Sequence, residues 1–288
     1  MTSYRSYEDY DTSANFYDGT RQALGVDIVL GLLAARGPRA TANDGDSPMS
    51  VLDIGCGTGN YLAALAPHGY RLTGLEYSAG MLAQAREKTR ALANVRLVRG
   101  SAFILPFPAG RFHAAMLNQV VHHFDNPGDS HDPAAFPMLR QALAQVYETL
   151  APGGLVLLNH CGQQQMMDAY WWVELFPNAM LRMCQRYISL PALRGMLAGI
   201  GFEYGGAIVP LDEVLQARDY LNLRGPLDEN WRRGDSTWTL ATDEELAAGQ
   251  ARLRAMLEDG SAEPWLAGRE ELRRKTGQTV YLWARRPA

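Results

Sequence analysis

A glycine-rich turn is the most chemically informative segment of the chain. Residues 53–60 read Asp-Ile-Gly-Cys-Gly-Thr-Gly-Asn, directly after a predicted apolar strand at 51–54 and directly before a predicted helix. Gly55 and Gly57 allow the backbone to turn tightly and to approach a ligand closely, while Gly59 lets the helix pack against the strand. The first turn of such a helix offers unpaired N–H groups. This context indicates a nucleotide-binding turn.

Two residues of the turn argue against a dinucleotide. The dinucleotide pattern requires glycine or alanine at position 60, where this chain has Asn60. Asp53 would repel a pyrophosphate, whereas a carboxylate suits a ligand that carries an ammonium group. Glu76 lies 21 residues after Gly55, at the end of the second predicted strand. An acidic side chain there can accept both hydroxyls of an adenosine ribose.

The surrounding pattern predicts the elements that position this turn. Short apolar strands alternate with helical segments as far as residue 158, and this alternation predicts a parallel sheet with helices on both faces. We therefore expect an α/β fold: a Rossmann-like, doubly wound, seven-stranded and mostly parallel sheet with helical inserts. The predicted strands cover residues 51–54, 70–75, 95–98, 112–117, 155–158, 207–209 and 279–284.

Composition excludes several classes of protein. The 288 residues are 47% hydrophobic and 20% charged, which is typical of a folded globular protein. Lys and Arg number 27 against 31 Asp and Glu, and this net charge of −4 disfavours a nucleic-acid partner. The three cysteines are too scattered for a metal site or a disulfide framework. We expect no metal, no membrane partner and a cytoplasmic location, because the chain shows no signal peptide and no apolar run of ~18–20 residues.

Five ordered motifs resemble one family. They are Val-Leu-Asp-Ile-Gly-Cys-Gly-Thr-Gly at 51–59, Glu-Tyr-Ser-Ala-Gly-Met at 76–81, Leu-Pro-Phe-Pro-Ala-Gly-Arg-Phe at 105–112, Asn-Gln-Val-Val-His-His-Phe at 118–124 and Leu-Ala-Pro-Gly-Gly-Leu at 150–155. Together they resemble the class I S-adenosylmethionine-dependent methyltransferases of the ubiquinone- and menaquinone-biosynthesis kind (methyltransferase type 11). The resemblance implies S-adenosyl-L-methionine as cofactor and S-adenosyl-L-homocysteine as product.

The resemblance also implies a role for each matching residue. The turn would hold the methionine part of the cofactor, Glu76 the ribose, and the residues after the second and third strands the adenine. The chain departs from the family at Ser101, where an aspartate is usual; its hydroxyl would accept the adenine hydrogen bond more weakly. The implied cofactor-binding residues are Tyr17, Asp53, Gly55, Cys56, Gly57, Asn60, Glu76, Tyr77, Met81, Ser101, Ala102, Phe103, Asn118 and Gln119.

Candidates for the methyl-acceptor side lie at two strand ends, in an aromatic segment and near the N-terminus. Histidines follow the fourth and fifth strands, where ligands of such sheets bind. The segment 166–176 would form an aromatic wall for a flat apolar acceptor; alternatively, its rings are core and its carboxylate faces solvent. Tyr17 and Arg21 would belong to a lid, or else to a polar tail. The predicted bases are His122, Glu174 and His160, and the predicted substrate residues are Tyr17, Arg21, His122, His123, Tyr170, Trp171, Trp172 and Phe176.

These features predict a methyltransferase that moves a methyl group from S-adenosylmethionine to a small, apolar or aromatic molecule. The transfer would rest mainly on positioning. The alternatives are a methyltransferase of RNA or protein, and a non-catalytic protein that binds the cofactor; a nicotinamide oxidoreductase is disfavoured by Asp53 and Asn60. We expect a monomer or homodimer. The predicted organisation is a lid and linker (1–48), the cofactor-binding core (49–160), an acceptor-pocket insert (161–190), more core (191–211), a helical insert (212–276) and the final strand (277–288).

Overall fold

The computed structural model describes residues 22–36, 48–125, 130–211, 220–233 and 235–288. The strands are β1 (Ser50–Ile54), β2 (Arg71–Glu76), β3 (Val95–Arg99), β4 (Phe112–Asn118), β5 (Leu150–His160), β6 (Glu203–Ile208) and β7 (Val280–Arg285). The helices are α2 (Val26–Arg36), α3 (Asn60–Leu65), α4 (Ala79–Thr89), α5 (Pro137–Thr149), α6 (Gln163–Asp168), α7 (Pro177–Arg186), α8 (Leu190–Ile200), α9 (Glu229–Arg232), α10 (Asp243–Asp259) and α11 (Ala262–Thr276). Short 3-10 helices cover Ala66–His68, Val121–His123, Pro133–Ala135, Trp171–Leu175, Gly225–Leu227 and Ser236–Leu240.

The strands form one seven-stranded sheet in the order β3-β2-β1-β4-β5-β7-β6. Strands β1 to β5 pair in parallel, while β7 runs antiparallel to both β5 and β6. The order reverses between β1 and β4, because β1 pairs on one side with β2 and on the other with β4. The predicted fold class is confirmed. In such sheets ligands bind at the carboxyl ends of the strands beside this reversal.

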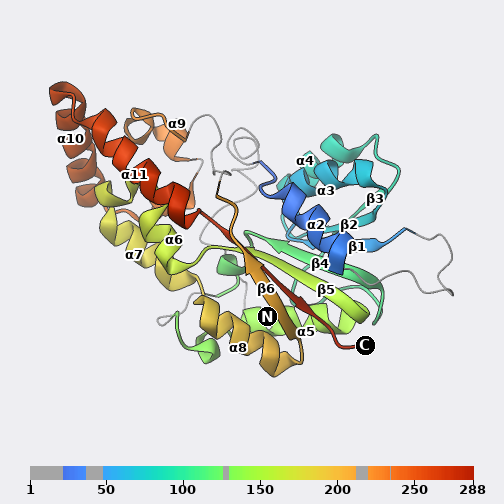
Figure 1. Ribbon diagram of the computed structural model, residues 1–288. Helices are drawn as coiled ribbons and strands as arrows, with labels where there is room; N and C mark the ends of the chain where they lie inside the picture. The colour runs from blue at the N-terminus through green and yellow to red at the C-terminus, as the bar shows by residue number, and fades with distance from the viewer. Residues whose placement is uncertain (1–21, 37–47, 126–129, 212–219, 234) are drawn as a thin grey trace.

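Helices cover both faces of the sheet. Helices α2, α3 and α4 lie on one face and α5 and α8 on the other (Figure 1). Strand residues therefore alternate between two apolar cores: Val51 belongs to the core under α2 and α3, and its neighbour Leu52 to the core under α5 and α8. Burial on both faces explains why the strands read as continuous apolar runs.

Two strands begin four or five residues before their predicted start, while the others lie within one residue of their predicted bounds at each end. Strand β6 spans Glu203–Ile208 rather than residues 207–209, because Gly205 and Gly206 belong to it. A Cβ at Gly205 would lie 1.9 Å from the Trp283 ring, so the glycine makes room for the indole. Strand β5 begins at Leu150, which pairs with Phe112 before a register shift. Neither glycines nor a Pro-Gly-Gly segment carries the alternation that predicts a strand.

A helical unit stands beyond the carboxyl end of β5. It consists of α6, α7, α9, α10 and α11 together with the 3-10 helices Trp171–Leu175, Gly225–Leu227 and Ser236–Leu240. Figure 1 shows these α-helices to one side of the sheet. Strand β5 leads into α6, and α11 leads back into β7, whose first residue Val280 pairs with His160. We call this unit the helical insert. Its position beside the strand ends allows it to contribute to a site there. None of the helices in the described ranges has the length and apolar character needed to cross a bilayer.

Candidate active site

The polar side chains of Asp53, which is buried, and Asn118, which is partly buried, lie where β1 and β4 end. Asp53 is 1% exposed, and its Oδ1 accepts a hydrogen bond of 3.3 Å from Nδ2 of Asn118. Oδ2 of Asp53 and Oδ1 of Asn118 are buried and have no hydrogen-bond donor among the described residues. Burial is the main cause that raises the pKa of Asp53 to about 7; the hydrogen bond from Asn118 lowers this pKa and the nearby charge of Glu76 raises it. Two buried acceptor oxygens without a donor therefore lie where the strand order of the sheet reverses.

The glycine turn beside them is built for close approach. Gly55 and Gly57 have φ of 69° and 53°, a region that favours glycine. A Cβ at Gly55 would lie 2.5 Å from Cγ2 of Val120, so that position is closed by protein. A Cβ at Gly57 would meet no atom of the described residues within 4 Å. Gly57 is thus the point of the turn where a ligand has room.

Glu76 connects this turn to the end of β2. Its carboxylate accepts three backbone hydrogen bonds: 3.0 Å from Gly57 N and 2.8 Å each from Tyr77 N and Ser78 N. These bonds fix the direction of the carboxylate beside Gly57. Its predicted role toward ribose hydroxyls stays a prediction, but the structure does bring it to Gly57.

The predicted adenine residues follow β2 and β3. These strand ends are adjacent, since Gly100 N donates to the Glu76 carbonyl at 3.0 Å. The Tyr77 side chain is 66% exposed, whereas Met81 is buried on α4. Ser101 Oγ accepts a hydrogen bond of 3.3 Å from Phe103 N, which closes a short turn. Ala102 and Phe103 pack against the core under α5 and α8.

Two residues of the glycine motif use their side chains for contacts within the protein, and the Cys56 sulfur lies 4.0 Å from the Gly57 carbonyl oxygen of the turn itself. The Asn60 amide oxygen accepts a hydrogen bond from the Lys88 ammonium on α4. The Cys56 thiol is buried beside Gly74, where a Cβ would lie 2.7 Å from its sulfur. Burial also raises the pKa of that thiol well above its usual range. Any contact of Cys56 with a cofactor would therefore come from its backbone.

Gln119, the residue after β4, is held in a strained conformation. With φ of 51° it is the one non-glycine residue in the described part of the chain with a positive φ. Asn159 on β5 holds it twice, because Gln119 N donates to the Asn159 carbonyl at 3.0 Å and Gln119 Nε2 donates to Asn159 Oδ1 at 2.8 Å. The Cys161 thiol lies 3.7 Å from Gln119 Oε1. Such strain persists where the surroundings over-determine it, typically at functional sites.

Sequence reasoning missed the network behind Gln119. Asn159 is fully buried and donates from Nδ2 to the Tyr61 hydroxyl at 3.3 Å. That hydroxyl lies 3.0 Å from the Tyr281 hydroxyl and donates to the Leu24 carbonyl at 2.9 Å. The network therefore links three strands, α3 and the segment before α2. A polar residue ending the apolar run 155–158 was the signal that could have revealed it.

The three histidines of the prediction gather near Tyr187. The His122 ring stacks on Tyr187 with centroids 4.3 Å apart, and the His123 ring lies 3.9 Å from that of His122. His160 is 1% exposed and its Nε2–H donates to the Ile188 carbonyl at 2.8 Å. Burial lowers the pKa of His160 to about 4, so this ring is neutral at neutral pH. Its Nδ1 is the lone-pair nitrogen.

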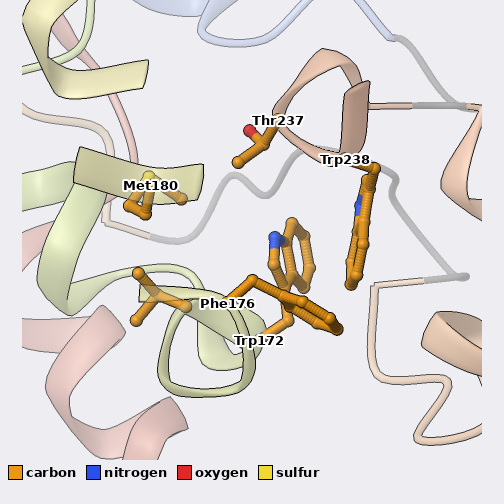
Figure 2. A pocket seen from close by; sticks show the side chains of 6 residues that line it. Trp172, Phe176, Met180, Thr237 and Trp238 are labelled. Atoms are coloured by element: carbon orange, nitrogen blue, oxygen red, sulfur yellow. The ribbon is translucent and has the colours of Figure 1, made fainter. Parts of the chain in front are cut away.

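The aromatic segment forms the core of the helical insert. The exposed fractions of Tyr170, Trp171, Trp172 and Phe176 are at most 5%. Trp171 Nε1 donates to the Tyr220 carbonyl at 2.5 Å. Figure 2 shows a crevice in this core, lined by Trp172, Val173, Phe176, Met180, Thr237 and Trp238. In this conformation it has no room for a water molecule. Contact of these rings with substrate stays a prediction.

Glu174 lies on the other side of that segment. Its carboxylate accepts a hydrogen bond of 2.9 Å from Trp265 Nε1 and pairs with Arg269 at 3.3 Å and Arg252 at 3.5 Å. These partners belong to α10 and α11, so the structure does not bring Glu174 together with Asp53, whose strand lies in the sheet. The observed contacts give Glu174 a cross-linking role within the helical insert.

Tyr17 and Arg21 lie outside the described residues. Within those residues, His, Cys, Asp and Glu form no group of three or more that is placed to hold a metal ion.

Comparison with known proteins agrees with this geometry. A family described as a methyltransferase domain matches residues 52–158. A demethylmenaquinone methyltransferase of Listeria welshimeri is 31% identical over 134 residues, which cover 42% of this chain and 51% of the relative. An uncharacterized 37.1 kDa protein of a Streptomyces fradiae transposon is 27% identical over 174 residues, covering 58% and 47%. The chain thus spans about half the length of the curated relatives it matches.

Solved structures share the fold. A candidate methyltransferase from an antibiotic biosynthesis pathway of Anabaena variabilis superposes with a TM-score of 0.62 at 20% identity, covering 90% of this chain and 96% of the other. Residues 52–158 of this chain therefore form a methyltransferase domain of the class I, S-adenosylmethionine-dependent family. S-adenosylmethionine is the cofactor of this class of domain.

The residues present fit that cofactor. Its amino acid end carries an ammonium group, and the two unsatisfied buried oxygens of Asp53 and Asn118 are suitable acceptors for such a group. Gly57 leaves room for it at the turn. Both features are observations on this chain, independent of the family match.

Proposed function

We propose that the protein transfers a methyl group from S-adenosylmethionine to a small, apolar or aromatic molecule. The observation that carries the proposal is the hydrogen-bonded Asp53–Asn118 pair, whose two buried, unsatisfied oxygens lie at the sheet reversal beside Gly57. The apolar helical insert follows β5 at the same sheet edge, which favours an apolar acceptor. The demethylmenaquinone methyltransferase relative supports an acceptor of this kind.

In this proposal the chain contributes mainly position and a dry surface. The cofactor supplies an activated methyl group, and transfer is an in-line displacement that depends on alignment. Asp53 and Asn118 would hold the ammonium end, and the strained Gln119 would present the end of β4 to the acceptor. His160 is neutral at neutral pH because burial lowers its pKa to about 4, so it is only a weak proton acceptor there.

A transfer assay tests the proposal. The protein is incubated with S-adenosylmethionine carrying a tritiated methyl group and with a panel of acceptors, from apolar phenols and hydroquinones to polar amines and carboxylates. We expect tritium in organic-extractable products of the apolar members. Transfer confined to polar acceptors, to RNA or to protein would contradict the acceptor class. Cofactor binding without any transfer would favour a non-catalytic protein.

A further inference from the structure

Two tryptophans of the helical insert each have a buried indole N–H group without a hydrogen-bond acceptor among the described residues. Trp172 and Trp238 are 1% and 8% exposed, and their indole N–H groups have no acceptor among the described residues. Two other indoles of the insert are satisfied: Trp171 donates to a carbonyl at 2.5 Å and Trp265 to a carboxylate at 2.9 Å. Buried indole N–H groups usually find an acceptor, so the exceptions require an explanation.

Both tryptophans line the same crevice. The Trp172 and Trp238 ring centroids are 6.3 Å apart, and Phe176 packs edge-on against Trp238 at 4.3 Å. Figure 2 shows the Trp172 nitrogen on the side of its ring that faces Met180 and Thr237. The crevice is lined by no charged side chain within the described residues. Its surface therefore combines apolar walls with two neutral donors, which suits an oxygen of an uncharged ligand.

The crevice connects to the end of β4 through aromatic and thiol contacts. The Tyr170 ring packs against Trp172 with centroids 5.4 Å apart. The Tyr170 hydroxyl lies 3.9 Å from the Cys161 sulfur, which in turn lies 3.7 Å from Gln119 Oε1. The two indoles thus belong to one continuous packed layer that reaches the strained residue of the strand-end site.

We propose that Trp172 and Trp238 select the methyl acceptor, by donating their indole N–H groups to a carbonyl oxygen on a flat, apolar, uncharged molecule. The inference rests on the proposed function, because it assigns the acceptor of that same reaction. A carboxylate or phosphate is disfavoured because none of the described residues that line the crevice is a cation. The crevice has no room for a water molecule in this conformation. Binding therefore requires the 3-10 helix Ser236–Leu240 to move Trp238 away from Phe176.

A matched pair of probes tests the inference without any need for turnover. 2-Acetonaphthone carries a ketone, and 2-ethylnaphthalene has the same shape without the oxygen. The protein, labelled with ¹⁵N at its six indoles, is titrated with each probe while the indole N–H signals are followed by NMR. We expect the ketone to move two signals downfield and to bind at least about tenfold more tightly than the hydrocarbon. Trp172→Phe and Trp238→Phe keep a ring but remove the donor.

The variants decide between outcomes. Each should lose one of the two shifted signals and reduce the preference for the ketone to about twofold, whereas Trp283→Phe, on β7, should change neither. Equal binding of both probes, or a preference that survives in both variants, would overturn the inference. The remaining five signals report folding, and either variant alone suffices if the other does not fold. S-adenosylhomocysteine is titrated separately, so loss of cofactor binding would count against the proposed function and not against the crevice.

Discussion

The strand-end site and the helical insert bury polar atoms of opposite kinds. At the ends of β1 and β4 the unsatisfied atoms are acceptors, the oxygens of Asp53 and Asn118. In the helical insert they are donors, the indole N–H groups of Trp172 and Trp238. A cationic ligand satisfies the first pair and a neutral oxygen the second. The contrast teaches that the two regions are suited to two different molecules, which is what a group transfer between a cofactor and an acceptor requires.

The two regions also differ in how they are assembled. The strand-end site is built from turns of a few residues, each fixed by local backbone geometry such as the positive φ of Gly57. The crevice of the helical insert joins residues 172–180 to residues 237–238, which are far apart in the chain. Changes in the first region should therefore act on cofactor binding alone, and changes in the second on packing and on the acceptor.

Closing the glycine turn should have the largest effect. In Gly57→Val a branched side chain would occupy the open space in front of the turn, at a φ of 53° that such residues disfavour. We expect binding of S-adenosylhomocysteine to weaken more than 100-fold by calorimetry. Gly110→Val is the control, because Gly110 has a similar φ of 67° and equally open surroundings outside the site. If a folded Gly57→Val protein bound S-adenosylhomocysteine with an affinity within threefold of that of the unchanged protein, the cofactor would not lie at this turn.

The pH dependence of binding should follow Asp53. Because its pKa is about 7, the free protein carries this carboxyl largely protonated at pH 6 and ionised at pH 8. An ammonium ligand prefers the ionised form, so affinity for S-adenosylhomocysteine should rise about tenfold from pH 6 to pH 8. Asp53→Asn should bind more weakly and show a flat profile. A flat profile in the unchanged protein would mean that Asp53 does not meet the ammonium.

Removing the charge of Glu174 should have the smallest effect of the three changes. It should lower the stability of the helical insert and leave cofactor binding at the strand-end site unchanged. Glu174→Gln weakens the contacts with Arg252 and Arg269, which are partly exposed, so we expect a loss of about 1 kcal/mol and a Tm lower by a few degrees. Binding of S-adenosylhomocysteine should stay within twofold. Glu87→Gln, in an exposed pair with Arg90, serves as the surface control. Loss of methyl transfer at unchanged Tm would instead make Glu174 catalytic.

The predictable part of the molecule is the part set by local sequence. Residue types at fixed spacing predict the glycine turn, the carboxylate of Glu76 and the strands that carry them. The fold class, a mostly parallel seven-stranded sheet with helices on both faces, was also predicted correctly. Strand β6 was misplaced because Gly205 looks like a turn residue until the indole of Trp283 is seen to fill its space. The reason for a glycine at position 205 is therefore a residue about eighty positions further along the chain.

Non-local packing also explains what was missed at the site. Trp172 was predicted as part of an aromatic wall, but its partner Trp238 comes from a segment that shows no periodic link to it. Asn159 was passed over beside His160, although it holds Gln119 by two hydrogen bonds. Such partners are chosen by the tertiary structure, and a single sequence contains no spacing that reports them.

Calorimetric titration with S-adenosylhomocysteine, run beside NADH, tests the central claim most directly. The buried acceptors at the sheet reversal and the open turn at Gly57 predict saturable binding of S-adenosylhomocysteine with one site per chain, and none of NADH. The same titration of Asp53→Asn should show weaker binding. Binding of NADH, or a folded protein that binds neither compound, would contradict the assignment of this site to a methyl-transfer cofactor.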